Sequence, residues 1–183
     1  MGDSLSAAYG IPREAGWVHL LARRLESRAP PIRVVNASVS GETSAGGRAR
    51  LPALLAAHRP AILILALGAN DGLRGLPPAE AGRNLEAMIR LARERGAAVL
   101  LVGMRLPPNY GGPYTRQFQA LFADVARATR VPLVPFLLEG VASQQERFQA
   151  DGLHPDAQAQ PALLDNVWRQ LAPMLEPGAR QRP

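Results

Sequence analysis

Residues 61–67 read Ala-Ile-Leu-Ile-Leu-Ala-Leu, and this unbroken apolar run decides the fold class. A strand covered on one face alternates apolar and polar side chains, whereas a strand covered on both faces is apolar throughout. The run is too short to cross a bilayer, and Gly68 follows it at once. It therefore predicts an inner strand of a parallel sheet.

Similar apolar runs lie on both sides of this strand and alternate with stretches of helical periodicity. We expect three further strands, at residues 32–37, 98–102 and 131–136. We expect amphipathic helices at residues 14–29, 44–58, 79–95, 115–129 and 159–175, where apolar side chains recur on one helical face. This alternation predicts an α/β fold, a three-layer α/β/α sandwich with a central parallel sheet.

Length and composition limit the classes of protein to consider. A chain of 183 residues predicts one domain, which we place at residues 1–176, with a disordered tail at 177–183. There are no cysteines, and we expect no metal site. The net charge of +6 comes from dispersed arginines without interleaved aromatic residues, so we expect no nucleic-acid partner.

Two short blocks near the ends of the chain contain the groups of a Ser-His-Asp relay. The first is Gly2-Asp3-Ser4-Leu5, and the second is Asp151-Gly152-Leu153-His154-Pro155. A serine hydroxyl needs a neighbouring base to become a nucleophile, and histidine is the natural base near neutral pH. The Asp-x-x-His spacing lets one loop present both the base and the carboxylate that orients it. Geometry rather than chain order identifies such a triad.

These residues also have ordinary structural interpretations. Ser4 would suit a helix N-cap, and Asp151 would suit an Asx turn with Gly152. Asp156 is a second carboxylate near His154. We favour Ser4, Asp151 and His154 as the catalytic set and expect Asp3 to be a structural hydrogen-bonding group.

Four separated blocks give the chain a resemblance to a known family. Besides Ser4 and His154, Gly41 lies in the run at residues 36–43 and Asn70 in the run at 67–72. In this order they resemble the Ser, Gly, Asn and His blocks of the SGNH/GDSL hydrolases. The runs at 49–55, 70–75 and 105–111 are similar to the bacterial thioesterase I/lysophospholipase/arylesterase subgroup.

The resemblance implies a flavodoxin-like fold and roles for further residues. An oxyanion hole would consist of the Ser4 and Gly41 backbone N–H groups and the Asn70 side-chain amide, although Gly41 and Asn70 would also suit turns. The loops at 72–78 and 106–113 would line an acyl-chain groove, with Leu73, Leu76, Leu106 and Tyr110 as substrate-binding residues. Ligands of parallel sheets gather beyond the carboxyl ends of the strands, where we expect Gly41, Asn70 and Tyr110.

The implied function is hydrolysis of carboxylic esters and thioesters of acyl chains through an acyl-enzyme on Ser4, without a cofactor. The implied partner is a small-molecule substrate, and we expect a monomer without stable membrane insertion. The alternatives are a sugar-ester deacetylase and a noncatalytic acyl-binding module on the same fold. Relatives in the subgroup are mostly exported, so we expect a periplasmic location, with the cytoplasm as the alternative because no signal peptide precedes Gly2.

The start of the chain differs from the family pattern. Family members have an inner apolar strand immediately before the Gly-Asp-Ser-Leu block, but here Met1 stands in that place. We therefore expect the first strand to be missing from this chain and an open slot to remain in the sheet.

Overall fold

Strands alternate with helices along the chain, and the strands form one parallel sheet. The computed structural model describes residues 1–176. The strands are β1 (Ile62–Leu65), β2 (Ala98–Val102) and β3 (Leu133–Val134), in the spatial order β1-β2-β3. Ile64 pairs with Leu100, and Leu101 pairs with Leu133.

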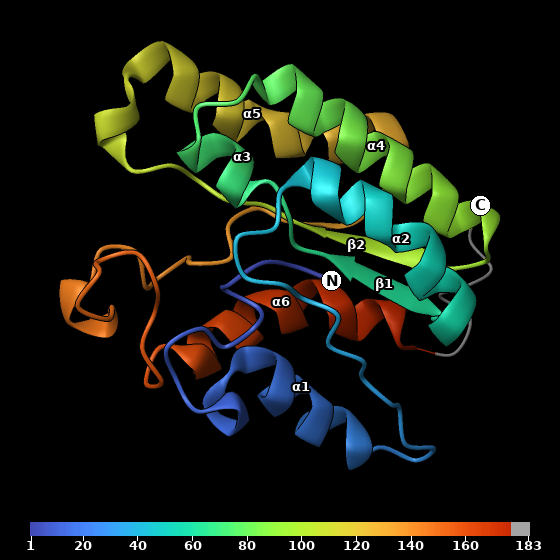
Figure 1. Cartoon of the computed structure of the whole chain (residues 1–183). Coiled ribbons are helices and arrows are strands. Elements are labelled where there is room, and N and C mark those ends of the chain that lie inside the picture. Colours follow the sequence, from blue (N-terminus) through green and yellow to red (C-terminus); the bar gives the residue numbers. More distant parts are fainter. Residues whose placement is uncertain (177–183) are drawn as a thin grey trace.

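Helices cover both faces of this sheet (Figure 1). One layer contains α2 (Ser44–His58), α4 (Pro78–Glu94) and α5 (Gly112–Thr129), and the other contains α1 (Trp17–Glu26) and α6 (Gln160–Met174). The short helix α3 (Ala69–Leu73) follows β1, and single 3₁₀ turns lie at η1 (Arg13–Ala15), η2 (Pro108–Tyr110) and η3 (Gln145–Arg147). The predicted three-layer α/β/α fold with a parallel sheet is confirmed.

Side chains alternate between two buried clusters along β1. Leu63 and Leu65 pack with α2, α4 and α5, whereas Ile62 and Ile64 pack with α1 and α6. This is why the strand contains no polar residue. Among the residues described, no helix combines the length and the apolar character that crossing a membrane requires.

Most predicted boundaries are close to those observed. The helix at 44–58 and the strand at 98–102 agree to the residue. The first predicted helix is shorter than expected, because Gly16 is extended and α1 begins only at Trp17. The strand predicted at 131–136 is limited to two residues, since prolines at 132 and 135 have no N–H to donate to a neighbouring strand.

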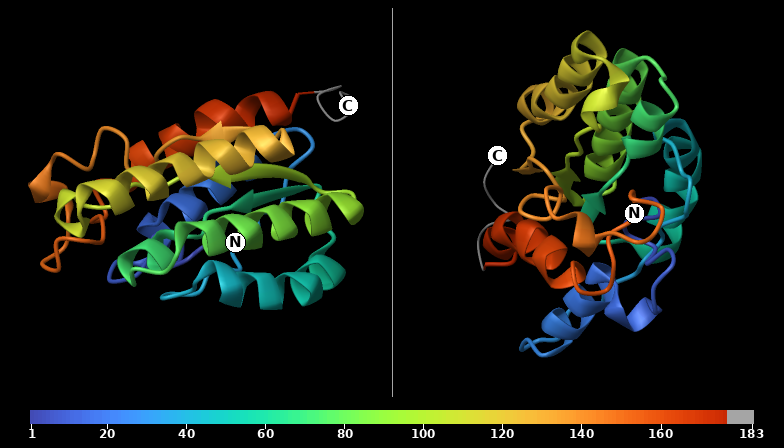
Figure 2. Two further views of the ribbon diagram at one scale, coloured as in Figure 1. Left: turned by 90° about the horizontal axis from the view of Figure 1, so that it is seen from above. Right: turned by 90° about the vertical axis from the view of Figure 1, so that its left-hand side faces the viewer.

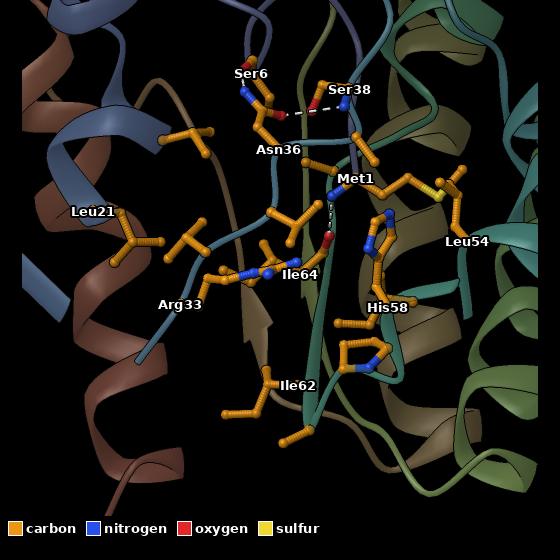
Figure 3. Close-up of a pocket in the computed structure, with 18 of the residues that line it drawn as sticks. Met1, Ser6, Leu21, Arg33, Asn36, Ser38, Leu54, His58, Ile62 and Ile64 are labelled. Carbon is orange, nitrogen blue, oxygen red and sulfur yellow. Dashed lines mark hydrogen bonds between the residues drawn. The ribbon is translucent and has the colours of Figure 1, made fainter. Parts of the chain in front are cut away.

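The strand predicted at residues 32–37 is wrong. This segment has no strand assignment, and the one backbone hydrogen bond of its N–H groups runs from Ile32 to the Leu25 carbonyl. A cavity of about 580 Å³ separates the segment from β1 (Figure 3). A strand needs a neighbour to receive its hydrogen bonds, and here the cavity occupies the place of that neighbour.

The start of the chain lies at this cavity. The Met1 ammonium donates to the Ile64 carbonyl at 2.9 Å, and Gly2 forms a single parallel bridge with Ala66. The block that contains Ser4 thus continues from one bridge rather than from a full strand. Residues 177–183, which we expected to form a disordered tail, lie outside the described residues.

Candidate active site

The four blocks meet at one end of the sheet. Asn70 lies in α3, directly beyond the carboxyl end of β1, and Gly41 lies in the loop before α2. Ser4 lies in the turns that follow Gly2, and His154 lies in the loop before α6. In Figure 1 these elements gather on the left, and the right-hand view of Figure 2 faces them.

Ser4, His154 and Asp151 form a continuous hydrogen-bonded array. The Ser4 Oγ lies 2.9 Å from His154 Nε2, and His154 Nδ1 lies 2.6 Å from Asp151 Oδ2. The His154 side chain is 22% exposed and the Asp151 side chain 38%. The array is therefore reachable from solvent on its Asp151 side.

The two oxygens of Asp151 have different partners. Oδ1 accepts the backbone N–H groups of Leu153 (2.9 Å) and His154 (3.0 Å), while Oδ2 faces the imidazole. These backbone N–H groups, together with the His154 side chain, lower the pKa of Asp151 to about 2. The Asx turn and the contact with His154 thus occur together in one arrangement.

The structure also tests the alternative roles considered for Ser4, Asp156 and Asp3. Residues 4–10 form consecutive turns without an α-helix, so Ser4 is not a helix N-cap. The Asp156 carboxylate accepts the Ala159 N–H at 2.9 Å, at the start of α6, rather than facing His154. Asp3 is buried and accepts the Leu5 N–H at 3.0 Å, as expected of a structural residue.

The expected oxyanion donors differ in their hydrogen bonding. Within residues 1–176 no hydrogen bond engages the backbone N–H of Ser4 or of Gly41. Gly41 has φ +77, a conformation that favours glycine, and the Arg74 guanidinium donates to its carbonyl at 2.9 Å. Asn70 Nδ2 donates to the Glu42 carbonyl at 3.0 Å and lies 3.4 Å from Asp3 Oδ2. One amide N–H is thus anchored, and the other is held only by a long contact.

Asp71 supports this corner, and the sequence analysis missed it. Its carboxylate is buried, accepts the Ser44 N–H at 2.7 Å and accepts the Ser44 hydroxyl at 2.6 Å. Asn84 of α4 donates to the same Ser44 hydroxyl at 3.0 Å. These bonds join α2, α3 and α4 beneath Asn70. No motif or spacing in the sequence predicts that Ser44, Asp71 and Asn84 contact one another, because they are far apart in the chain.

Asp3 has an unusual protonation equilibrium. Burial raises its pKa to about 6, although the Leu5 N–H and the charge of His154 act in the opposite direction. The carboxyl group is 2% exposed. An ionisable group therefore lies next to Ser4 with almost no solvent contact.

The predicted substrate-binding residues differ in their exposure. Leu76 is exposed, and Leu73 and Tyr110 are half-buried and pack on the core, with the Tyr110 hydroxyl donating to the Leu73 carbonyl at 3.3 Å. Leu106 is buried among core residues. The sequence analysis missed Tyr114, whose hydroxyl donates to the Leu76 carbonyl at 2.7 Å and fastens this loop to α5.

Tyr9 is a further residue that the sequence analysis missed. Its ring centroid lies 4.6 Å from that of His154, and the side chain is exposed. In the part of the chain that the structure describes, no group of three His, Asp or Glu side chains is placed to hold a metal ion.

A parallel α/β sheet with a Ser-His-Asp array beyond its strand ends defines a hydrolase-type site. The chain belongs to the GDSL-like Lipase/Acylhydrolase family, whose sequence model matches residues 1–161. The resemblance to SGNH/GDSL hydrolases is thereby confirmed.

Individual relatives agree with this membership. The chain is 54% identical to Esterase TesA of Pseudomonas aeruginosa over 96% of this chain and 87% of that protein. It is 42% identical to Thioesterase 1/protease 1/lysophospholipase L1 of Escherichia coli K12 over 96% of this chain and 83% of that protein. The crystal structure of the psychrotrophic esterase EstA from Pseudoalteromonas sp., inhibited by monoethylphosphonate, superposes with a TM-score of 0.90 at 38% identity, covering 96% of each chain.

Proposed function

We propose that this chain hydrolyses carboxylic esters and thioesters of acyl chains through an acyl-enzyme on Ser4. Its family membership makes it an ester-bond hydrolase. The observation that carries the specific mechanism is the unbroken array from Ser4 Oγ through His154 to Asp151, with distances of 2.9 and 2.6 Å. The names of the relatives, which include an esterase and a thioesterase, support the substrate class.

In this mechanism His154 acts as the general base. The ionised Asp151 accepts a hydrogen bond from the Nδ1–H of His154, which fixes the tautomer and leaves the lone pair of Nε2 free to take the Ser4 proton. The lowered pKa of Asp151, about 2, supports this assignment, because the carboxylate is then ionised at neutral pH. Ser4 Oγ then attacks the carbonyl carbon of the substrate.

The Ser4 N–H, the Gly41 N–H and the Asn70 amide would donate hydrogen bonds to the carbonyl oxygen as it becomes negatively charged. Donors that are already in place stabilise this charge without reorganisation. The Arg74 bond to the Gly41 carbonyl and the Asp71 bonds to Ser44 support such fixed placement. His154 then protonates the leaving alkoxide or thiolate, and a water molecule, activated by the same imidazole, releases the acid.

The acyl chain would lie along the loops that carry Leu73, Leu76 and Tyr110. Tyr110 and Tyr114 fasten these loops through main-chain carbonyls. Leu106 would support these loops rather than contact the acyl chain, because its side chain is buried in the core. We further propose that the protein is monomeric and is located in the periplasm.

The test is a panel of p-nitrophenyl esters from acetyl to palmitoyl, with acyl-CoA thioesters beside it. We expect turnover of medium or long acyl chains, labelling of Ser4 by a fluorophosphonate, and loss of both in Ser4→Ala with folding intact. Turnover confined to acetyl esters of sugars would favour the deacetylase alternative. A folded protein with no burst of p-nitrophenol would favour the noncatalytic module, and labelling at another serine would overturn the assignment of Ser4.

A further inference from the structure

The contact between Ser4 and His154 joins two segments that no sheet or α-helix holds together. Residues 4–10 form turns, and residues 148–155 form the loop before α6. The two catalytic side chains are 150 residues apart in the chain. Their 2.9 Å separation therefore depends on whatever fastens one segment to the other.

We infer that Gln149 is a positioning residue that clamps these two segments together, an inference that rests on the proposed function. Its side-chain Nε2 donates to the Tyr9 carbonyl at 2.8 Å and to the Pro155 carbonyl at 3.2 Å. Pro155 directly follows His154, and the Tyr9 N–H donates to the Ser4 carbonyl at 3.3 Å. The two N–H groups of one primary amide thus donate to both segments, one to the turn that contains Ser4 and one to the loop that contains His154.

The main chain of Gln149 also closes the loop that carries the base. Its N–H donates to the His154 carbonyl at 2.8 Å, and its carbonyl accepts the Gly152 N–H at 2.9 Å. Among the hydrogen bonds of residues 1–176, the Gln149–Tyr9 bond is the one direct link between 4–10 and 148–155 besides Ser4–His154 itself. Removing it leaves the Ser4–His154 contact supported by the Tyr9–His154 ring contact and by an indirect route, in which Gln160 and Trp17 join the Asp156 carbonyl to the Leu5 carbonyl.

The side chain of Gln149 lies tightly against the turn that it holds. Gly10 has φ +73, and a Cβ at this position would collide with Gln149 Oε1. The held carbonyl belongs to Tyr9, whose ring lies beside the imidazole of His154. The clamp therefore keeps both the nucleophile's turn and this aromatic contact in place.

The consequence concerns proton transfer rather than substrate binding. The Ser4 proton can be taken only within hydrogen-bond reach of Nε2, and a displacement of about 1 Å can cost on the order of 10²-fold in rate. None of the hydrogen bonds of Gln149 involves the loops of Leu73, Leu76 and Tyr110. Loss of the clamp should therefore lower kcat and leave KM in place.

The test compares Gln149→Met, which keeps side-chain length without a donor, with Gln144→Met. Gln144 is a matched control, since its amide also donates to a main-chain carbonyl, that of Gly140 at 2.6 Å, but away from the site. Active sites are counted by fluorophosphonate titration, and kcat per titrated site, KM and the labelling rate are measured with a p-nitrophenyl ester. We expect Gln149→Met to lose about 10- to 100-fold in kcat per site and a similar factor in labelling rate. KM should stay near the native value, and Gln144→Met should behave like the native protein.

Three results would overturn the clamp: native kcat per site in Gln149→Met, an equal loss in Gln144→Met, or fewer titratable sites with native kcat at each. If Gln149→Met does not fold, Gly10→Ala displaces the same side chain, and native kcat per site in that variant would overturn the clamp as well. Failure of the proposed function differs from all of these, because the native protein itself would then show no labelling at Ser4, and the clamp would fall with it.

Discussion

Replacing Asp3 with Asn should remove a pH dependence of folding that this buried carboxyl group creates. Burial raises the pKa of Asp3 from 3.8 to about 6. A difference of about two pKa units corresponds to roughly 3 kcal/mol. The side chain is 2% exposed, so solvent screening does not reduce this figure appreciably.

The sign follows from which state holds the proton more tightly. Between about pH 4 and pH 6 the folded protein keeps Asp3 protonated while the unfolded chain has lost that proton. The contribution of Asp3 to the free energy of unfolding is therefore largest below pH 4 and falls as the pH rises through about 6. Above that, the ionised buried carboxylate lowers stability by roughly 3 kcal/mol relative to a group whose pKa is the same in both states.

The assay is urea unfolding of the native protein and Asp3→Asn from pH 4 to pH 8. Asparagine keeps an oxygen for the Leu5 N–H but places an amide near Asn70, which adds an offset that does not vary with pH. Burial lowers the pKa of the Met1 ammonium to about 6, so its contribution to the free energy of unfolding falls as the pH falls from 8 to 6. This pH dependence is opposite in sign to that of Asp3. Because Met1 is present in both proteins, its effect cancels in their difference.

We expect the free energy of unfolding of the variant minus that of the native protein to rise by up to about 3 kcal/mol between pH 4 and pH 7 and then to level off. A difference constant to within about 0.5 kcal/mol across this range would refute the reasoning. It would show that Asp3 does not titrate differently in the folded and unfolded states.

Further substitutions test the remaining parts of the site and the cavity. Asn70→Ala should lower kcat by about 10²–10³, roughly 2.7–4 kcal/mol, with KM little changed in steady-state ester hydrolysis; a loss confined to KM would show that Asn70 only binds substrate. Asp151→Asn should lower kcat on the order of 10⁴-fold, because an amide donor facing Nδ1 favours the wrong tautomer of His154; activity within tenfold of native, measured per titrated site, would contradict this role. About six to ten β-branched residues fused ahead of Met1 should raise Tm above that of a Gly/Ser extension of equal length, since they continue the pairing with β1 into the cavity; equal Tm values would show that the cavity does not accept a strand.

Local patterns predicted those elements whose burial is decided locally. In α4 the stripe of Leu85, Met88, Ile89 and Ala92 is fully buried, and β2 has the predicted bounds. The run at 32–37 also contains β-branched residues but forms no strand, because pairing depends on a neighbour that sequence periodicity does not describe. The same limit explains Leu106, which looked like a groove residue but packs in the core.

The contacts within the candidate triad could be predicted because its residues lie in short blocks that resemble those of a known family. Ser4, Asp151 and His154 lie at hydrogen-bonding distance as the sequence suggested. Their supports were not predictable. Gln149 and Tyr9 are 140 residues apart, and neither belongs to a motif that the sequence analysis could name.

The two halves of the candidate site are held by different kinds of structure. Gly41 and Asn70 lie next to α2 and in α3, where the buried Asp71 carboxylate accepts two short hydrogen bonds from Ser44. His154 lies on an exposed loop, which the Gln149 amide joins directly to the Ser4 turn and which Gln160 and Trp17 join to it indirectly. A buried charged hydrogen bond resists opening far better than a bond at the surface, where water replaces the lost partner. We therefore expect loosening of the molecule to separate His154 from Ser4 before it displaces Gly41 and Asn70, so that activity is lost ahead of the fold.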